Sequence, residues 1–529
     1  MNKRRGIWTL VMLALALTVA RAQDQASSGQ SVPDQTAPTP DAADRSAQGN
    51  SAQGNSQPQQ QALPPQSTTP STMPSYGENL PSMEENPPIS GLDQPGLEPH
   101  GAPLSYIQPG ATISESADSN VGNTTGGGAV QSITRGLGSV ELQRLWSHYD
   151  LAAQYIGGAA YYNNNNIGWK LLQQMDLDQK ITWKRGQLSL RDSFGYLPEG
   201  NFGAAYGSLG SQGIASLGNT SFGSFWGGAG LGTFGLVSRI TNVSVADVSE
   251  SLTPKSTVTA AGGYAVTHFY GTTPDPITAQ PISLLDNRQV SAQVGYNRLI
   301  SSRTQVALIY GYQGFDFPSF DESFHSHVFL GMYGHRITGR MDFLIGAGPQ
   351  ITDITLFGSI PDQRIGVAGR MRLRYQLPRT SFDLSYERFN TSGSGFFAGA
   401  QTDTAVLSAQ HNLTRVWNVF TDLGYSRNSR LLPLDNTQLA TCNPAGVFNL
   451  NPKLPTCPGV NANTYSYGFV GVGAHRAFGR NFHGFVSYEF NRLAFDNSYC
   501  AGLSVCSRIG NRSVGTVGLD WTPRPIRID

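Results

Sequence analysis

The 529-residue sequence is poor in charge, because Lys, Arg, Asp and Glu make up only 14% of it and the formal net charge is zero. Without a basic surplus there is no electrostatic basis for a nucleic-acid partner. Long apolar runs are also missing. No stretch after residue 22 approaches the roughly 20 apolar residues that a membrane helix needs. The chain is therefore either soluble or crosses a membrane as a closed β-barrel.

Cysteine is rare as well. The four cysteines, Cys442, Cys457, Cys500 and Cys506, lie in two segments between expected strands. In an exported protein, an even set predicts disulfides. Of the three possible pairings we expect the local ones, Cys442–Cys457 and Cys500–Cys506, rather than a staple between the two segments. The hydrolase motifs G-x-S-x-G and H-E-x-x-H are absent, so we expect neither enzyme activity nor a cofactor.

The N-terminus carries an export signal. A basic segment, MNKRR, is followed by the short apolar run GIWTLVMLALALTVA and by the A-x-A sequence ARA before Gln23. This order predicts a signal peptide over residues 1–22, because the apolar run is too short for a membrane anchor. The mature protein therefore leaves the cytoplasm.

A low-complexity arm follows the signal. Residues 23–108 consist mainly of Gln, Ser, Pro, Ala and Thr without apolar periodicity, so they cannot bury enough apolar surface to offset their ordering entropy. We predict a disordered arm that serves as a passive spacer, with contact to a periplasmic partner as the alternative. Residues 109–148 are expected to be a linker that contains an edge or lumen segment.

From residue 149 onward, long runs alternate apolar and polar residues. In the run 287–300, Val290, Val294 and Tyr296 alternate with polar neighbours, which is strand periodicity with one apolar face. Such runs are about 14 residues long. Strands of soluble proteins cluster near 5–6 residues, whereas a tilted membrane strand needs about 9–11. The length favours strands that cross a membrane.

The connections between these runs alternate in length. Short turns lie at residues 184, 253, 301, 338, 378 and 479, and long connections span 199–236, 271–286, 355–363, 428–463 and 496–511. Trp183, Trp417 and Trp521 lie beside the short turns, as expected of a girdle at a membrane interface. We predict an all-β fold, a transmembrane antiparallel up-and-down β-barrel of about 16 strands over residues 149–522, with a tail at 523–529.

Charged residues occupy the positions that alternate with the lipid-facing ones. We place six charges of one hairpin on the inner face: Arg364, Arg370, Arg372, Arg374, Asp383 and Glu387. The turn at residue 378 puts the two carboxylates within cross-strand reach of the arginines. The row is either a solvated, partly neutralised wall or an electropositive stripe that selects anionic solutes.

Charged residues on two other strands follow the alternation less regularly. Asp176, Asp178, Lys180 and Arg191 also fall on the inner face of their strands. Asp192 falls on the lipid-facing side, which requires either a bulge or a subunit contact.

Two further features each have a functional and a purely structural interpretation. His325 and His327 share one face but lack an evident third ligand, so we expect a polar lumen wall there rather than a metal site. The glycine-rich segment 199–235 is long for an ordinary loop, and folded into the lumen it would narrow a pore.

The barrel pattern and the hairpin ITWKRGQLSLRDSFGYLPEGNFG, residues 181–203, resemble the porin-like outer-membrane β-barrel proteins of Gram-negative bacteria. The chain departs from these proteins at its end, DWTPRPIRID, which is not aromatic. The resemblance implies an outer-membrane location, contact with lipid and lipopolysaccharide, and homo-oligomers as an option. Two functions fit: a channel for small hydrophilic solutes, with anions as the candidate class, or a non-conducting surface barrel whose disulfide-tied outer loops bind a partner or polysaccharide.

Overall fold

The computed structural model describes residues 88–91, 105–121, 128–163, 167–197, 224–226, 238–270, 273–274, 281–282, 284–318, 322–355, 362–431, 462–500 and 507–528. All of them belong to one compact unit, Ser67–Asp529. The predicted signal peptide and most of the predicted arm lie outside the described residues. No helix within these described ranges is long and apolar enough to cross a membrane.

In the described part of the chain, eighteen long strands form one sheet that closes on itself. These strands are β1 (Tyr106–Asp118), β2 (Gln131–Leu145), β3 (Tyr149–Tyr162), β4 (Gly168–Trp183), β5 (Gly186–Leu197), β6 (Ser238–Thr253), β7 (Ser256–Tyr270), β10 (Asn287–Ser301), β11 (Thr304–Phe317), β12 (Glu322–Thr338), β13 (Met341–Thr355), β14 (Asp362–Gln376), β15 (Thr380–Thr391), β16 (Ala400–Asn412), β17 (Trp417–Arg430), β18 (Thr464–Phe478), β19 (Phe482–Phe495) and β20 (Ile509–Trp521). The short elements are β8 (Thr273–Pro274), β9 (Pro281–Ile282), β21 (Ile526–Arg527), and the 3-10 helices η2 (Ser224–Trp226), η3 (Gly393–Gly395) and η4 (Asn497–Cys500).

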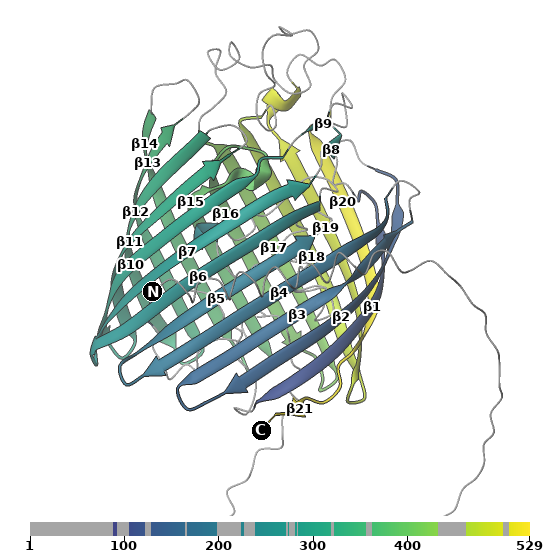
Figure 1. The fold of residues 1–529 in the computed structure, drawn as a ribbon, viewed down its shortest axis with the longest axis horizontal. Helices are drawn as coiled ribbons and strands as arrows, with labels where there is room; N and C mark the ends of the chain where they lie inside the picture. Colours follow the sequence, from purple (N-terminus) through teal and green to yellow (C-terminus); the bar gives the residue numbers. More distant parts are fainter. Residues whose placement is uncertain are drawn as a thin grey trace, which may run out of the picture. The chain divides into compact units, whose positions relative to one another are not determined.

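Neighbours in the ring are antiparallel and consecutive. β7 pairs directly with β10, because β8 and β9 form a separate hairpin, and β1 pairs with β20 to close the ring. The turns from β4 to β5 and from β10 to β11 lie at the same end of the barrel as the start of β1 and the end of β20 (Figure 1). We call this the short-turn end and the opposite end the long-loop end. The predicted class, an antiparallel up-and-down barrel, is confirmed.

The strand count is higher than the sequence predicted. We expected about 16 strands beginning at residue 149, with 109–148 as a linker, but β1 and β2 occupy this region and raise the count to 18. β1 escaped prediction because inner positions such as Gln108 are polar and Pro109 lies within the strand, so apolar alternation is weak. The count remains even, which keeps both ends of the barrel at the short-turn end.

The expected boundaries of the arm and the tail also change. Residues 88–91, inside the segment predicted to be disordered, are described and contact the barrel wall. The tail at 523–529 contains β21, which pairs with the first residues of β1. Local composition did not predict either contact, because each depends on a partner far away in the sequence.

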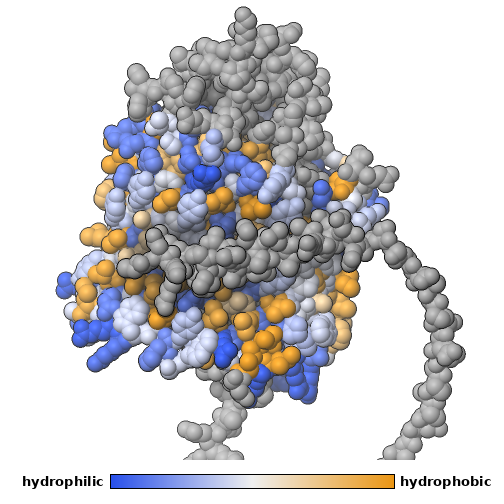
Figure 2. All heavy atoms as spheres, viewed as in Figure 1, coloured by the Kyte–Doolittle hydropathy of each residue, from blue (hydrophilic) through white to orange (hydrophobic). Residues whose placement is uncertain are grey.

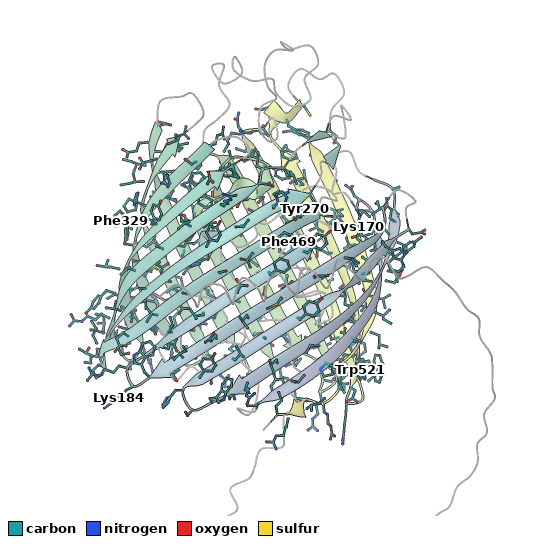
Figure 3. The ribbon with its side chains drawn as sticks, viewed as in Figure 1. Lys170, Lys184, Tyr270, Phe329, Phe469 and Trp521 are labelled. Carbon is teal, nitrogen blue, oxygen red and sulfur yellow. The ribbon has the colours of Figure 1, made fainter. Side chains whose placement is uncertain are left out.

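Outward-facing side chains form an apolar exterior. On β10 the outward Val290, Val294 and Tyr296 are 51%, 53% and 41% exposed. Gln289, on the opposite face, is buried. Apolar residues are spread over the visible outer face in Figure 2, and Phe329 projects outward in Figure 3. A closed sheet with an apolar exterior satisfies its backbone internally, as lipid requires of β-structure.

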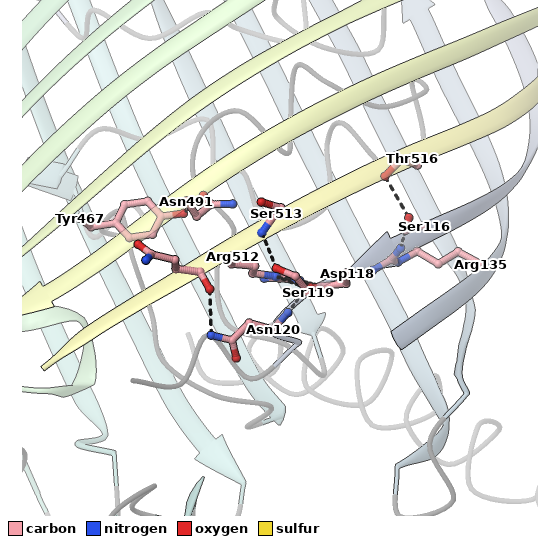
Figure 4. Close-up of polar contacts among 11 residues, drawn as sticks. Ser116, Asp118, Ser119, Asn120, Arg135, Tyr467, Asn491, Arg512, Ser513 and Thr516 are labelled. Carbon is pink, nitrogen blue, oxygen red and sulfur yellow. Dashed lines mark hydrogen bonds and ion pairs between the residues drawn. The ribbon is translucent and has the colours of Figure 1, made fainter. Parts of the chain in front are cut away.

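Polar contacts on the inner face hold β1 against β20 (Figure 4). The Arg512 Nε donates to both carboxylate oxygens of Asp118 at 2.9 Å, and both side chains are buried. Farther along the same seam, the Ser116 hydroxyl lies 3.0 Å from the Thr516 hydroxyl and accepts from Arg135 Nη1 at 2.9 Å. These contacts join the first strand of the ring to the last.

The ladder between β14 and β15 is shorter than its neighbours. Its last pair toward the long-loop end is Gly369 with Arg388, whereas β14 pairs with β13 as far as Asp362. Beyond this point β15 turns inward, and the Asn390 Nδ2 donates to Thr352 Oγ1 of β13 at 2.7 Å. The long-loop end of β15 therefore leaves β14 and lies toward the lumen, while it stays paired with β16 as far as Thr391.

Candidate functional site

Three arginines project from alternate positions of β14 on the face opposite its exposed apolar residues. Ile365, which is 77% exposed, marks the outer face. On the inner face, Arg370 lies 3.5 Å from Glu387 and Arg372 lies 3.0 Å from Asp383, both acids belonging to β15. The short turn between β14 and β15 brings these side chains together, because it sets the register of the hairpin.

The third arginine takes its partner from the other neighbour. Arg374 donates from Nε and Nη2 to the Asp342 carboxylate of β13, at 2.8 and 2.6 Å. This pair could not be read from the sequence, because the connection between β13 and β14 is long and leaves the register open. Arg364 lies near the long-loop end of β14, 3.4 Å from Asp362, and this pair is 42% and 51% exposed.

The ladder formed by Arg370, Arg372 and Arg374 with their carboxylates is close to neutral, since three arginines lie beside three acidic side chains. A guanidinium carries five N–H donors in a planar fork that suits carboxylate and phosphate groups. The ladder is therefore a wall rich in hydrogen-bond donors with a weak net field.

A second group of charges lies on the inner face of β4 and β5, which are eight and seven strand positions from β14 around the ring. Asp176 accepts a hydrogen bond from the Ser193 hydroxyl at 2.5 Å. Arg191 lies 3.5 Å from Asp178. Lys180 follows on the same face of β4. The two charged groups are thus nearly opposite each other across the barrel.

The helix η2 narrows the space between them. Its Phe225 carbonyl accepts hydrogen bonds from Gln289, Ser291 and Gln313 of β10 and β11, at 2.7, 3.0 and 3.0 Å. The Phe225 ring lies against Gly311, where an added Cβ would come within 2.7 Å of the ring. The sequence singled out the segment around η2 as a candidate to narrow the lumen but not these residues. The adjacent aromatic residues Phe225 and Trp226, within a glycine-rich stretch, were the sequence feature that could have identified this contact.

The remaining parts of that segment, 199–223 and 227–235, lie outside the described residues. η2 packs within an apolar cluster that includes Val243, Ile309 and Phe389 from the inner wall. Burial of η2 against several strands shows that this part of the connection lies inside the barrel.

Apolar side chains also fill the long-loop half of the barrel. Phe396 and Phe397, between β15 and β16, are buried beside Tyr465 of β18. Phe315 and Phe324 stack with their ring centroids 4.3 Å apart in another inner cluster. The sequence placed charged residues on inner positions of other strands and did not predict this apolar filling. Strands there carry apolar residues on both faces, so alternation does not identify the inner one.

The paired histidines face outward, so the expectation of a polar lumen wall there is wrong. His325 and His327 lie 2.9 Å from the hydroxyls of Tyr312 and Tyr310, respectively, on the outer face. The inner positions of β12 are taken by buried residues such as Val328. No group of three or more His, Cys, Asp or Glu side chains in the described ranges is placed to hold a metal ion.

Asp192 also faces outward, and the register of β5 with β6 is continuous around it. Its carboxylate accepts hydrogen bonds from Asn242 Nδ2, at 3.2 and 3.3 Å, and from the Ser244 hydroxyl. A bulge therefore does not turn it inward. Partner side chains on the neighbouring strand reduce the cost of a carboxylate on this face.

Tryptophans gather at the short-turn end. Trp183, Trp417 and Trp521 are exposed at the ends of β4, β17 and β20, and Figure 3 shows Trp521 at the lower rim. The Trp183 Nε1 donates to Glu250 at 2.6 Å, and the Arg476 guanidinium lies 5.3 Å from the Trp417 ring centre. Rings with an apolar body and a hydrogen-bonded edge suit the boundary between lipid and water.

Three of the four cysteines, Cys442, Cys457 and Cys506, lie outside the described residues. Cys500 ends η4 and packs beside a buried aromatic cluster at the long-loop end. The local disulfide pairing stays a prediction.

A closed barrel without a free edge strand, with an apolar exterior and tryptophans at its rim, has the architecture of an outer-membrane barrel. With 18 strands it is wide enough to enclose charged side chains and chain segments. The described strands thus form a closed antiparallel up-and-down β-barrel whose exterior suits an outer membrane.

No protein-family model and no curated protein matches the sequence. Solved structures to which the chain is similar include Pseudomonas aeruginosa OccK2 (OpdF) in complex with glucuronate, with a TM-score of 0.38 and 9% identity over 79% of this chain and 98% of that one. The outer membrane protein OpdK of the same organism gives 0.37 and 9%, over 79% and 99%. OprD of the same organism gives 0.36 and 8%, over 79% and 95%. No residue role is carried over at this identity.

Proposed function

We propose that this protein is a channel for small hydrophilic solutes with a mild preference for anions. The observation that supports the proposal is the row of Arg370, Arg372 and Arg374 on the inner face of a closed barrel. Like charges inside a barrel raise the local concentration of counter-ions, and salt screens this effect over about 10 Å at 0.1 M. The carboxylate beside each arginine offsets much of the field, so selectivity is mild rather than strict.

The test replaces the three arginines with glutamine and measures reversal potentials in planar bilayers under a salt gradient. Glutamine removes the charge but keeps a donor for the neighbouring carboxylates, and inner positions tune selectivity more than stability. We expect a conducting wild type whose reversal potential shifts toward cation preference in the variant, most clearly at low salt.

A matched control removes the same charge from the outer face. Arg388, Arg427 and Arg492 lie on outward positions of β15, β17 and β19, in the long-loop half. Changing all three to glutamine should leave the reversal potential unchanged. If the inner and outer triple variants behave alike, the ladder is only a solvated wall and the anion preference is wrong.

A second function is favoured by the apolar packing in the long-loop half. Buried clusters around Phe396 and Phe324 fill inner positions that an open pore would leave wet. We infer that, if the protein does not conduct, it is a surface barrel whose outer loops bind a partner or polysaccharide. Absence of single-channel events from folded, inserted protein with and without its arm would support this function over the channel.

A further inference from the structure

A four-residue turn of the N-terminal arm, residues 88–91, lies inside the barrel. The Ser90 carbonyl accepts hydrogen bonds from Thr259 Oγ1 of β7 and Gln293 Nε2 of β10, both at 2.9 Å. The Ser90 hydroxyl lies 3.0 Å from the same Thr259 hydroxyl, and Ser90 has no exposed surface. This segment, which we call the arm turn, is bonded to the inner wall.

The wall is shaped to receive the arm turn. The Ile89 N–H donates to Asn297 Oδ1 of β10 at 3.3 Å. A Cβ added to Gly295 would come within 2.6 Å of the Ser90 Cβ, and one added to Gly334 would come within 3.2 Å of the Ile89 side chain. Larger residues at these wall positions would displace the arm turn, so glycine is needed for the close approach.

The arm turn lies beside η2 in the narrowed part of the barrel. Ile89 packs against the same apolar cluster that contains Phe225 and Trp226. Two segments from distant parts of the chain therefore meet on one side of the lumen. Both lie between the charged ladders of β4–β5 and β13–β15.

The contacts are close to the short-turn end. Thr259 is the fourth residue of β7, and Asn297 lies four residues before the end of β10. Both residues therefore lie within four residues of a strand end that leads into a short turn. β1 begins at the same end, at Tyr106. The intervening 13 residues, 92–104, can reach about 40 Å when extended, so the arm turn need not dock on the strands next to β1.

We propose that the arm turn is a reversible stopper that narrows the channel from the periplasmic side. This inference rests on the proposed channel function and specifies its regulation. Four hydrogen bonds of modest net value oppose the cost of ordering four residues, so the docked and released states are close in free energy. Release of the arm turn widens the lumen beside η2, where the Phe225 ring remains attached to the wall.

Docking is tested without reference to conduction. Ser90→Cys combined with Thr259→Cys places two thiols where two hydroxyls lie 3.0 Å apart, within reach of a disulfide. We expect this pair to cross-link on mild oxidation, as shown by peptide mapping that also resolves the four native cysteines. Ser90→Cys with Val290→Cys is the control, because Val290 faces outward. Cross-linking of neither pair, or of both equally, would overturn the docking.

The effect on conduction is tested in planar bilayers with full-length protein. Deletion of residues 87–91 should raise the single-channel conductance and remove a low-conductance state, whereas deletion of residues 40–44 from the same arm should change neither. Thr259→Val, which removes one donor with little change of shape, should make the low-conductance state shorter-lived. The oxidised Ser90→Cys/Thr259→Cys protein should stay in that state until reduced.

The outcomes separate the two proposals. Equal conductance of the wild type and the 87–91 deletion overturns the stopper and leaves the channel intact. Failure of every variant to conduct, with the cross-link formed, overturns the channel function and the stopper with it. Higher conductance of the 87–91 deletion variant than of the wild type, and of the Ser90→Cys/Thr259→Cys protein after reduction, supports both.

Discussion

At the residue scale, Asp118 and Arg512 form an ion pair between β1 and β20, the strands that close the barrel. Their side chains are 0% and 1% exposed. Removing one member of a buried ion pair is costly, at roughly 3–5 kcal/mol. We therefore expect Asp118→Ala to lower the free energy of unfolding by about that amount. Urea unfolding of the detergent-folded protein, followed by tryptophan fluorescence and by the gel shift on heating, measures the change.

The matched control for this prediction is the exposed pair of Asp362 with Arg364 at the long-loop end of β14. Exposed ion pairs contribute about 0–1 kcal/mol, so Asp362→Ala should have little effect on the free energy of unfolding. Equal losses of unfolding free energy for the two substitutions would mean that the buried pair stabilises the barrel no more than the exposed pair does.

At the scale of the element, closure of the ring depends on β1 and β2, which connect β3 to β20. Removing residues 105–146 leaves sixteen strands, the number expected from the sequence. The shortened ring also loses Asp118 and exposes the edges of β3 and β20, which lipid does not tolerate. We expect this variant to fail to reach the heat-resistant form in the outer membrane.

Truncation after Thr522 is the control for the hairpin deletion. It removes β21, which contributes only two pairs with β1, and leaves Trp521 in place. This truncated protein should assemble. Assembly of the hairpin deletion as well would mean that residues 149–522 form a barrel by themselves and that β1 and β2 are dispensable.

At the scale of the whole molecule, the arm divides into a part that composition predicts to be disordered and a turn bound inside the barrel. Limited proteolysis of the folded protein should remove residues ahead of about position 87, while the peptide containing Ser90 stays with the barrel. Mass spectrometry of the resistant product locates its new N-terminus. Rapid cleavage within 88–91, at the same rate as the rest of the arm, would contradict docking.

Much of the wall was predictable because strand alternation is a local property. The spacing of Arg370 and Arg372, with the tight turn that follows, is enough to predict that they share a face with Asp383 and Glu387. The structure has these side chains 3.0 and 3.5 Å apart. A short turn sets register, so residues within one hairpin can be paired from sequence.

The sequence by itself determined the class of fold, the alternation of short turns with long connections, and the facing of residues within hairpins. Only the tertiary structure decided that β1 and β2 complete an 18-strand ring, that Arg374 binds Asp342, that the histidines of β12 face outward, and that residues 88–91 dock on the inner wall. The reason is physical. Each of these depends on contacts across long connections or across the lumen, where neither a turn nor an alternating pattern constrains which residues meet.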